Sequence, residues 1–223
     1  MGGREVGDPY EDARRAMVAL IERYGVRDRR VLDAMLEVPR HLFVPEEQRR
    51  RAYEDHPLPI ECGQTISQPY IVALMSELME LRGGERVLEV GTGSGYQAAV
   101  LSLLAAEVYG VEYRRELFER VKTRLAEAGY GDVHLRCGDG YWGWPEAAPF
   151  DAVMITCGAP RVPEPLIEQL KTGGRIVLPL GRPPHSLSLV RFRKTSRGLV
   201  KDSRGAVSFV PMRGRVERPP EEK

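Results

Sequence analysis

Short apolar runs alternate with longer segments of helical periodicity along most of the chain. The apolar runs at residues 86–90 and 107–112 are bounded by glycine or polar residues and predict buried strands. After the second run, Leu117, Val121 and Leu125 repeat at the spacing of one helix face. Strands that alternate with helices indicate an α/β fold built on a parallel sheet. Further runs predict strands at residues 133–137, 150–155, 175–180, 187–192 and 206–210.

The front of the chain predicts two short amphipathic helices. Apolar residues repeat at helical spacing over residues 17–24 and again over 32–36. Prolines then interrupt residues 38–60, so we expect irregular and partly extended chain there. Another helix is expected after Pro69. This front section is too short and loop-rich for an independent domain, and we expect it to pack over the main sheet.

The end of the chain predicts a closing pair of strands and a tail. A helix over residues 166–170 is expected to end at the glycines 173–174, before the strand that starts at Arg175. The polar stretch 194–205 is expected to join the last two strands. Residues 213–223 are charged and rich in proline, which predicts a disordered tail.

A glycine-rich turn, GTGSG, follows the first strand and opens into a helical pattern. Strand, tight loop and helix form the first unit of a nucleotide-type α/β fold. Glycines at positions 91, 93 and 95 let the main chain turn sharply and leave no β-carbon between the loop and a ligand. A dinucleotide fingerprint would need one more glycine, at the position of Tyr96.

Acidic residues near the ends of successive strands suggest the kind of ligand. Glu89 is expected to face the pocket, where its carboxylate would repel a pyrophosphate but suit a cation. S-adenosylmethionine carries a sulfonium and an ammonium and no phosphate, so the charge pattern favours it over NAD. Glu112 ends the second strand, where an acid can bind the ribose hydroxyls of an adenosine ligand or serve only as a cap. Asp139 follows the third strand, where it can reach an adenine amino group or simply form a turn.

Composition narrows the class of protein further. The chain has 223 residues, 42% hydrophobic and 29% charged, which suits one globular α/β domain. A net charge of +1 gives no reason to expect a polyanionic partner. The three cysteines and four histidines show no metal-ligand spacing, so no metal is expected. The N-terminus lacks the apolar stretch of a secretory signal and no run is long enough to span a membrane, so we expect a cytoplasmic enzyme.

Two side chains near the expected cleft have an ordinary structural interpretation. Spacing alone makes Ser67 a helix cap, although a hydroxyl at such a helix start can also help to bind a carboxylate. Cys157 follows the strand at 150–155, and no histidine is placed to activate it. We therefore interpret Cys157 as a packed thiol.

The glycine loop, Glu112, the turn at 138–140 and the segment 150–160 together resemble a class I S-adenosylmethionine-dependent methyltransferase. The stretch GQTISQPY at residues 63–70 is similar to the signature of the protein-L-isoaspartate O-methyltransferase family. The resemblance extends over about residues 13–212. Shorter similar stretches are VPR at 38–40, FVP at 43–45, AY at 52–53, PLPI at 57–60 and FVPM at 209–212.

This resemblance implies a fold and a division of the chain. The fold is a Rossmann-like, doubly wound, mostly parallel seven-stranded sheet with helices on both faces and an N-terminal helical extension. The whole chain forms a single methyltransferase domain. Within it, about residues 8–80 form the substrate-side extension, 81–212 the cofactor-binding core and 213–223 the tail.

The resemblance also assigns roles to individual residues. It implies that Ser67 is the catalytic residue. This chain has Glu61 and Cys157 where glycine and alanine are common in the family, and both flank the substrate cleft. The implied cofactor contacts are Glu89, Gly91, Thr92, Gly93, Glu112, Asp139 and Gly140. The implied substrate contacts are Gln64, Thr65, Ile66, Thr156, Ala159 and Pro160.

The implied reaction is methyl transfer from S-adenosylmethionine to the free carboxylate of L-isoaspartyl residues in damaged proteins or peptides, which starts repair through a succinimide. That carboxyl titrates at roughly 3 to 4, so it is ionised at neutral pH and needs no general base. The expected partners are isoaspartyl proteins and peptides, with no nucleic acid and no membrane, and a monomer is expected.

Other functions stay open at this point. One is a methyltransferase that acts on RNA or a small molecule, although the RNA version is weakened by the missing basic patch. Another is an NAD-dependent oxidoreductase, against which Tyr96 and Glu89 argue. A third is an adenosine-binding module without catalytic activity.

Overall fold

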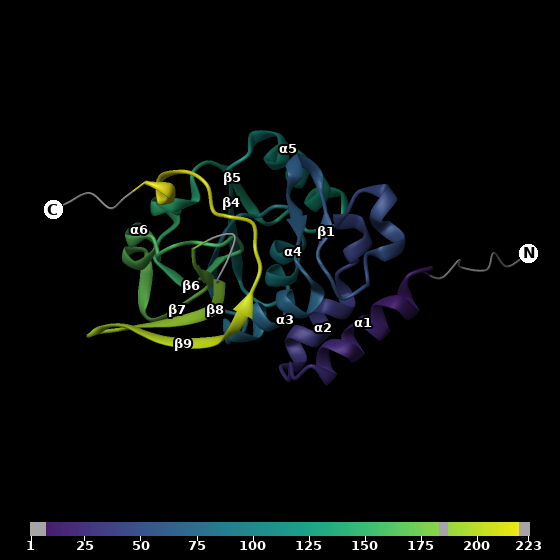
Figure 1. Ribbon diagram of the computed structural model, residues 1–223, viewed down its shortest axis with the longest axis horizontal. Coiled ribbons are helices and arrows are strands. Elements are labelled where there is room, and N and C mark those ends of the chain that lie inside the picture. The colour runs from purple at the N-terminus through teal and green to yellow at the C-terminus, as the bar shows by residue number, and fades with distance from the viewer. Residues whose placement is uncertain (1–7, 183–186, 219–223) are drawn as a thin grey trace, which may run out of the picture.

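A seven-stranded sheet forms the centre of the molecule in the computed structural model, which describes residues 8–182 and 187–218 (Figure 1). Its strand order is β5-β4-β3-β6-β7-β8-β9. The first five strands in this order are parallel, and β8 and β9 are antiparallel to their neighbours. The predicted mostly parallel sheet is therefore confirmed. The strands are β3 (Arg86–Val90), β4 (Glu107–Glu112), β5 (His134–Cys137), β6 (Phe150–Ile155), β7 (Leu170–Gly181), β8 (Leu187–Thr195) and β9 (Gly198–Val207).

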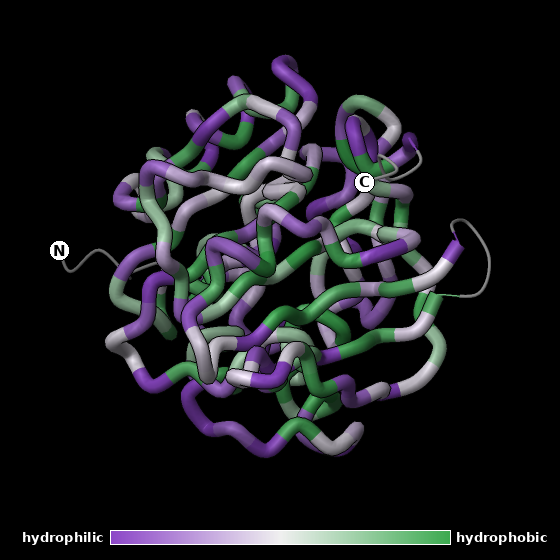
Figure 2. Tube along the Cα trace, turned by 90° about the vertical axis from the view of Figure 1, so that its left-hand side faces the viewer, coloured by the Kyte–Doolittle hydropathy of each residue, from purple (hydrophilic) through white to green (hydrophobic). Residues whose placement is uncertain are grey.

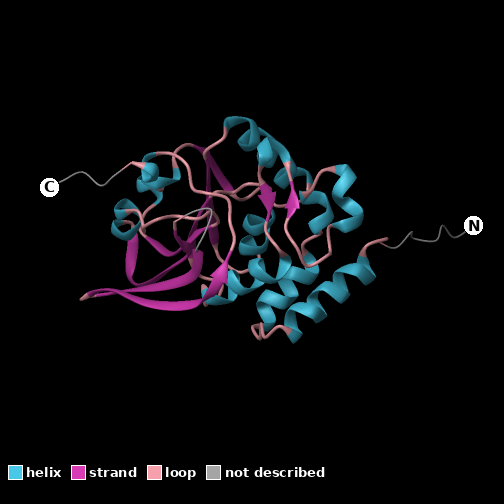
Figure 3. Ribbon diagram, in the orientation of Figure 1, coloured by secondary structure: helices cyan, strands magenta, loops and turns pink. Residues whose placement is uncertain are grey.

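Most of the helices lie together on one side of the molecule, and β8 and β9 lie on the other (Figure 3). A separate two-stranded ribbon, β1 (Leu58–Pro59) with β2 (Thr65–Ile66), precedes the third helix. The α-helices are α1 (Glu11–Arg23), α2 (Arg29–Glu37), α3 (Pro69–Leu78), α4 (Tyr96–Ser102), α5 (Arg115–Glu127) and α6 (Glu164–Glu168). The 3-10 turns are η1 (Arg40–Phe43), η2 (Glu46–Arg51), η3 (Glu61–Gly63), η4 (Gly140–Trp142), η5 (Pro145–Ala147) and η6 (Arg215–Glu217).

The two faces of the sheet belong to two apolar cores, because successive side chains of a strand point to opposite faces. Val87 and Met154 lie in the larger core, together with buried residues of α1 to α5. Leu88 and Val153 lie in the smaller core, together with Leu166 of α6 and buried residues of the last segment. Hydrophobic stretches accordingly run through the middle of the molecule, as Figure 2 shows.

The N-terminal extension belongs to the larger core. Helices α1 and α2 confirm the two predicted amphipathic helices, and α2 is capped by the Asp28 side chain, which accepts from the Arg30 amide at 2.9 Å. Residues 38–60 form two 3-10 turns and one short strand, as their prolines predicted. Phe43 is fully buried there. The extension therefore completes the hydrophobic cover of one sheet face.

The C-terminal third differs from the prediction in the bounds of three strands. The stretch 194–205 was expected to be a connection, but β8 continues to Thr195 and β9 starts at Gly198. Strand β9 is the edge of the sheet and most of its residues are exposed, so its polar composition gave no strand signal. Strand β7 begins at Leu170 rather than Arg175, and its register against β6 shifts between Phe150 and Ala152.

The tail differs as well. Residues 213–223 were expected to be disordered, but the described part includes η6, and Val216 is only 1% exposed in the smaller core. A single buried valine among charged residues is a weak sequence signal, which explains the error. Residues 219–223 and His185 lie outside the described residues.

Candidate functional site

The glycine-rich loop lies at the carboxyl end of β3, in the middle of the parallel part of the sheet. Gly91 and Gly95 have φ values of +93° and +90°, a region that residues with a β-carbon rarely adopt. A β-carbon on Gly95 would lie 2.6 Å from Cγ2 of Val121 in α5, and one on Gly91 would lie 2.9 Å from Oγ1 of Thr156. The loop therefore needs glycine both for its turn and for its close packing.

Glu89 is fully buried beneath this loop. Among the described residues, neither of its carboxylate oxygens has a hydrogen-bond partner. Burial, and then the nearby charge of Glu112, raises the pKa of Glu89 well above its ordinary value of 4.5. A buried carboxylate without a partner is costly, and a cationic ligand group would satisfy it. This orphaned acid fits the ammonium group of S-adenosylmethionine.

Glu112 is the last residue of β4, and its carboxylate binds the main chain of the glycine loop. Its two oxygens accept hydrogen bonds from the amides of Gly93 and Arg114, both at 2.9 Å. The side chain is 5% exposed, so it is fixed in position before any ligand arrives. A carboxylate oxygen has two lone pairs, which leaves acceptor capacity for hydroxyl groups.

Two adjoining cavities lie around the loop. We call the first the loop pocket; it is lined by Gln64, Thr65, Gly91, Gly93, Glu112, Tyr113, Gly140, Thr156, Cys157 and residues 210–213, among others. We call the second the serine pocket; it is lined by Thr65, Ile66, Ser67, Val72, Glu89, Gly91, Thr92, Gly93, Ser94, Tyr96, Gln97 and Thr156. Thr65, Gly91, Gly93 and Thr156 belong to both, so the two cavities meet at the glycine loop.

Ser67 lies between β2 and α3, and its place differs from the cap that spacing alone predicted. The N-cap of α3 is Gln68, and the capping carboxylate is that of Asp55, which accepts from the Tyr70 amide at 2.9 Å. Within the described chain, the Ser67 carbonyl accepts a hydrogen bond but the Ser67 hydroxyl makes none. The hydroxyl is therefore available to a ligand in the serine pocket.

Asp139 does not line either pocket, although Gly140 lines the loop pocket. The Asp139 carboxylate accepts from the amides of Tyr141, at 2.9 Å, and Arg215, at 2.7 Å. A β-carbon on Gly140 would lie 2.3 Å from Cγ1 of Val90. Adenine recognition by Asp139 stays a prediction.

The segment after β6 is only partly at the site. Thr156 lines both pockets, and its hydroxyl donates to the carbonyl of Gly91 at 2.5 Å. Ala159 is fully buried and its amide donates to the carbonyl of Pro179 at 3.0 Å, whereas Pro160 is exposed. Neither lines the two pockets, so their substrate contacts stay predictions.

Cys157 lines the loop pocket with a buried thiol. Burial, and then the charges of Glu112 and Glu89, raises the pKa of Cys157 to about 12. A thiol with this pKa is protonated at neutral pH and is a poor nucleophile. The geometry agrees with the interpretation of a packed thiol.

One wall of the loop pocket was not assigned from the sequence. The carbonyl of Val210 accepts from the Gly158 amide, and the Met212 amide donates to the Gly158 carbonyl, both at 2.8 Å. These bonds hold residues 210–213 against the pocket. Hydrogen bonds between main-chain atoms do not depend on residue type, so the spacing of side chains could not predict this contact.

The described residues offer neither a metal site nor a membrane-spanning helix. In residues 8–182 and 187–218, no group of three or more His, Cys, Asp or Glu side chains could hold a metal ion. Within the same ranges, no helix is long and apolar enough to cross a membrane.

Comparison with known proteins identifies the family. Residues 12–217 match the family described as Protein-L-isoaspartate(D-aspartate) O-methyltransferase (PCMT). The chain belongs to this family. It is 54% identical over 209 residues to Protein-L-isoaspartate O-methyltransferase 2 of Anaeromyxobacter sp., covering 94% of this chain and 86% of the relative. It is 48% identical over 205 residues to Protein-L-isoaspartate O-methyltransferase of Dictyoglomus thermophilum, covering 92% and 93%.

Solved structures agree with membership of the protein-L-isoaspartate O-methyltransferase family. One, named protein-L-isoaspartate O-methyltransferase, has a TM-score of 0.82 and 35% identity, covering 91% of this chain and 67% of that chain. A putative family enzyme of Plasmodium falciparum, in complex with S-adenosyl-L-homocysteine, has the same fold with a TM-score of 0.78 and 24% identity, covering 90% and 98%. The predicted family, fold and enzyme class are confirmed.

Proposed function

We propose that this protein transfers a methyl group from S-adenosyl-L-methionine to the free carboxylate of L-isoaspartyl residues in proteins and peptides. Membership of the family supports the reaction. The observation that carries the proposal is Glu89, a buried carboxylate without a partner, which shares the serine pocket with Ser67. One cavity thus combines a site for a cation with a free hydroxyl that can orient a carboxylate.

The cofactor would occupy the space around the glycine loop. Glu89 would hold its ammonium group and Glu112 its ribose hydroxyls, while Gly91 and Gly93 let the main chain approach. Gly140 would border the adenine, because a side chain there has no room beside Val90. When bound, S-adenosyl-L-methionine supplies an electrophilic methyl group on a positively charged sulfur.

The protein's task in the transfer is orientation rather than proton removal. The substrate carboxylate is already ionised at neutral pH, which agrees with the absence of histidine among the described residues that line the two pockets. The Ser67 hydroxyl would donate to one carboxylate oxygen and aim the other at the methyl group. The Cys157 thiol, whose pKa is raised to about 12, would stay protonated and would not compete as a nucleophile.

The main-chain nitrogen that follows the methyl ester would attack the ester carbonyl and close a succinimide with loss of methanol, and water can then reopen the ring to normal aspartate. The protein would therefore act in the repair of damaged proteins. A monomeric state, a cytoplasmic location and independence from nucleic acid stay predictions.

The experiment that tests the proposal compares two peptides that differ only in an isoaspartyl or an aspartyl residue. Labelled methyl from S-adenosyl-L-methionine should enter the isoaspartyl peptide as a base-labile ester and should not enter its aspartyl twin. Ser67→Ala should largely keep cofactor affinity and lower the rate of methyl transfer, whereas Ser203→Ala on the exposed edge strand should change neither. Labelling of neither peptide, with cofactor bound, would favour a methyltransferase for RNA or a small molecule.

A further inference from the structure

The main chain at Ser67 is held by a buried arginine. Nη2 of Arg40 donates to the carbonyl of Ser67 at 2.8 Å, and Nε of Arg40 donates to the carbonyl of Ala52 at 2.7 Å. Arg40 belongs to η1, and its side chain is fully buried. One guanidinium group therefore joins the serine segment to a distant part of the N-terminal extension.

Arg40 carries a buried charge that the carboxylate of Asp55 favours without forming an ion pair with it. In the part of the chain that the structure describes, Arg40 is in no ion pair, and its Nη1 has no hydrogen-bond partner. Burial lowers the pKa of Arg40 to about 10, so the group is still protonated at neutral pH. A buried cation without an ion pair is costly, and an apolar side chain of similar volume would fill the space without that cost. The contacts of Arg40 therefore indicate a role other than packing.

The same segment of the extension fixes the residues that follow Ser67. The carboxylate of Asp55 accepts from Nε2 of Gln68 at 2.8 Å and from the amide of Tyr70 at 2.9 Å. Arg40 and Asp55 thus hold the chain on both sides of the serine hydroxyl and leave the hydroxyl itself free.

Arg40 also contacts the start of the helix that follows the glycine loop. Its guanidinium carbon lies 4.9 Å from the centre of the Tyr96 ring, which fits a cation-π contact. Tyr96 is the first residue of α4 and lines the serine pocket together with Ser67. Arg40 contacts both Ser67 and Tyr96 but does not line the pocket itself.

We propose that Arg40 is a positioning residue that sets the place of the Ser67 hydroxyl relative to the glycine loop. This inference rests on the proposed function, in which Ser67 orients the substrate carboxylate. A group misplaced by about 1 Å can lower a rate by roughly 100-fold, so a small shift of the serine segment has a large effect on turnover.

Arg40→Lys tests the inference, because lysine keeps the charge but lacks the planar fork that reaches two carbonyls. We expect kcat for an isoaspartyl peptide to fall by roughly 10- to 100-fold. The KM for the peptide and the dissociation constant of the cofactor should change by less than about 3-fold, because Arg40 does not line the pocket. Arg40→Met should lose more, and Arg40→Lys still decides the matter if the methionine variant does not fold.

Arg30→Lys is a control for the loss of an arginine bridge between two carbonyls, at an exposed position. Arg30 also bridges two carbonyls, those of Leu81 at 2.8 Å and Leu104 at 3.0 Å, but it lines neither pocket. Its substitution should leave kcat unchanged. Equal losses of kcat in the two lysine variants would overturn a specific role of Arg40.

A double variant separates positioning from a general loss of structure. If Arg40 acts through the serine hydroxyl, Arg40→Lys should cost almost nothing in a protein that already carries Ser67→Ala. The same fold-loss in both backgrounds would overturn the inference. A Ser67→Ala protein as active as the wild type would instead overturn the proposed role of Ser67, which keeps the two failures distinct.

Discussion

Glu89 and Glu112 lie on neighbouring parallel strands but differ in their hydrogen bonding. Glu112 accepts two main-chain hydrogen bonds, from Gly93 and Arg114, whereas Glu89 has no partner among the described residues. Burial is the larger cause of the raised pKa of Glu89, and the charge of Glu112 adds to it. One acid is therefore fixed by the protein, and the other is left for a ligand.

Cofactor binding should release a proton. The pKa of Glu89 is raised in the free protein, and a ligand ammonium beside it would favour the ionised form and lower that pKa. Because the ionised form then binds more tightly, affinity for S-adenosyl-L-methionine should rise with pH through the raised pKa. Calorimetry in two buffers with different ionisation enthalpies measures the number of protons released. Identical binding enthalpies in both buffers would contradict this coupling.

Glu89→Gln should make the free protein less sensitive to alkaline pH. The folded pKa of Glu89 lies above its unfolded value, so its contribution to stability is present at low pH and is lost as pH rises toward the folded pKa. The wild type should lose up to about 1.4 kcal/mol per pH unit across that window relative to the glutamine variant. Urea unfolding of both free proteins at pH 5 and pH 8 checks this. The same variant should bind the cofactor more weakly.

A constant difference in unfolding free energy between pH 5 and pH 8 would show that Glu89 is already ionised in the folded protein at pH 5, which would contradict its raised pKa. Glu119→Gln is a suitable control, because Glu119 is exposed on α5. Its difference from the wild type should stay small at both pH values.

The parts of the site that are local in sequence could be predicted, and the long-range parts could not. The glycine loop, Glu89 and Glu112 all lie in or directly after an apolar run, so their meeting at one sheet edge follows from strand order. The Arg40 side chain donates to the main-chain carbonyl of Ser67, 27 positions away, and a contact that ends on a main-chain atom does not depend on the type of the accepting residue. The use of Asp139 as a partner of the Arg215 amide was hidden for the same reason.

Glu112→Ala should weaken cofactor binding by roughly 10- to 100-fold. It would remove an acceptor for the ribose hydroxyls, and hydrogen bonds to a charged group contribute about 1.5 to 3 kcal/mol. It would also leave the Gly93 amide without its acceptor and loosen the loop. Titration of the folded variant with S-adenosyl-L-homocysteine measures the change. An unchanged dissociation constant would refute the ribose assignment.

The fold was predictable wherever burial shapes the sequence. Strands β3, β4 and β6 are apolar because both of their faces are covered, and they were found from that property. Strand β9 pairs only with β8 and exposes most of its side chains, so its residues resemble those of a loop. The largest error in the sheet therefore lies at its edge, in β9.

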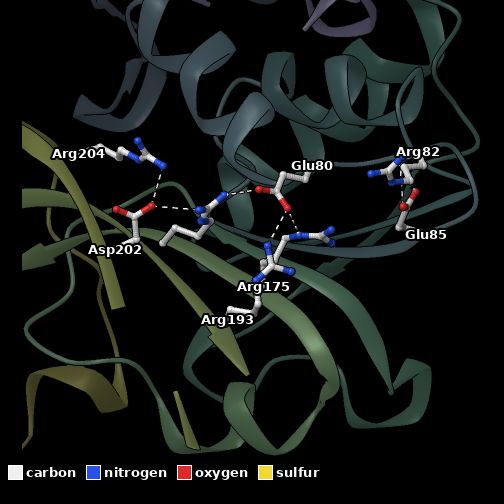
Figure 4. A network of polar contacts seen from close by, with 8 residues as sticks. Glu80, Arg82, Glu85, Arg175, Arg193, Asp202 and Arg204 are labelled. Atoms are coloured by element: carbon white, nitrogen blue, oxygen red, sulfur yellow. Dashed lines mark hydrogen bonds and ion pairs between the residues drawn. The ribbon is translucent and has the colours of Figure 1, made fainter. Parts of the chain in front are cut away.

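An ionic cluster between α3 and the antiparallel strands provides a test of stability away from the site. Arg175 and Arg193 lie directly opposite each other on β7 and β8. Glu80, just beyond α3, pairs with Arg175 at 3.2 Å and Arg193 at 2.8 Å, as Figure 4 shows. It also pairs with Arg191 at 2.5 Å. Like charges that face each other across strands are destabilising, and Glu80 offsets that repulsion.

Glu80→Ala should lower the free energy of unfolding by about 1 kcal/mol, a small value because the side chain is 41% exposed and screened by solvent. Burial alone would raise the pKa of Glu80, but the hydrogen bond from Arg193 and the charges of Arg191, Arg193 and Arg175 lower it. Its contribution should therefore be present at neutral pH and lost as pH falls below about 4, the usual range of a glutamate.

Urea unfolding at pH 7 and pH 3.5, each at low and high salt, measures this contribution. The difference between Glu80→Ala and the wild type should shrink in 1 M NaCl, because the Debye length there is only about 3 Å. Methyl transfer at neutral pH should be unchanged, since Glu80 lines neither the loop pocket nor the serine pocket. If the loss of stability is the same at both pH values and both salt concentrations, packing at the end of α3 is responsible and the ionic account is wrong.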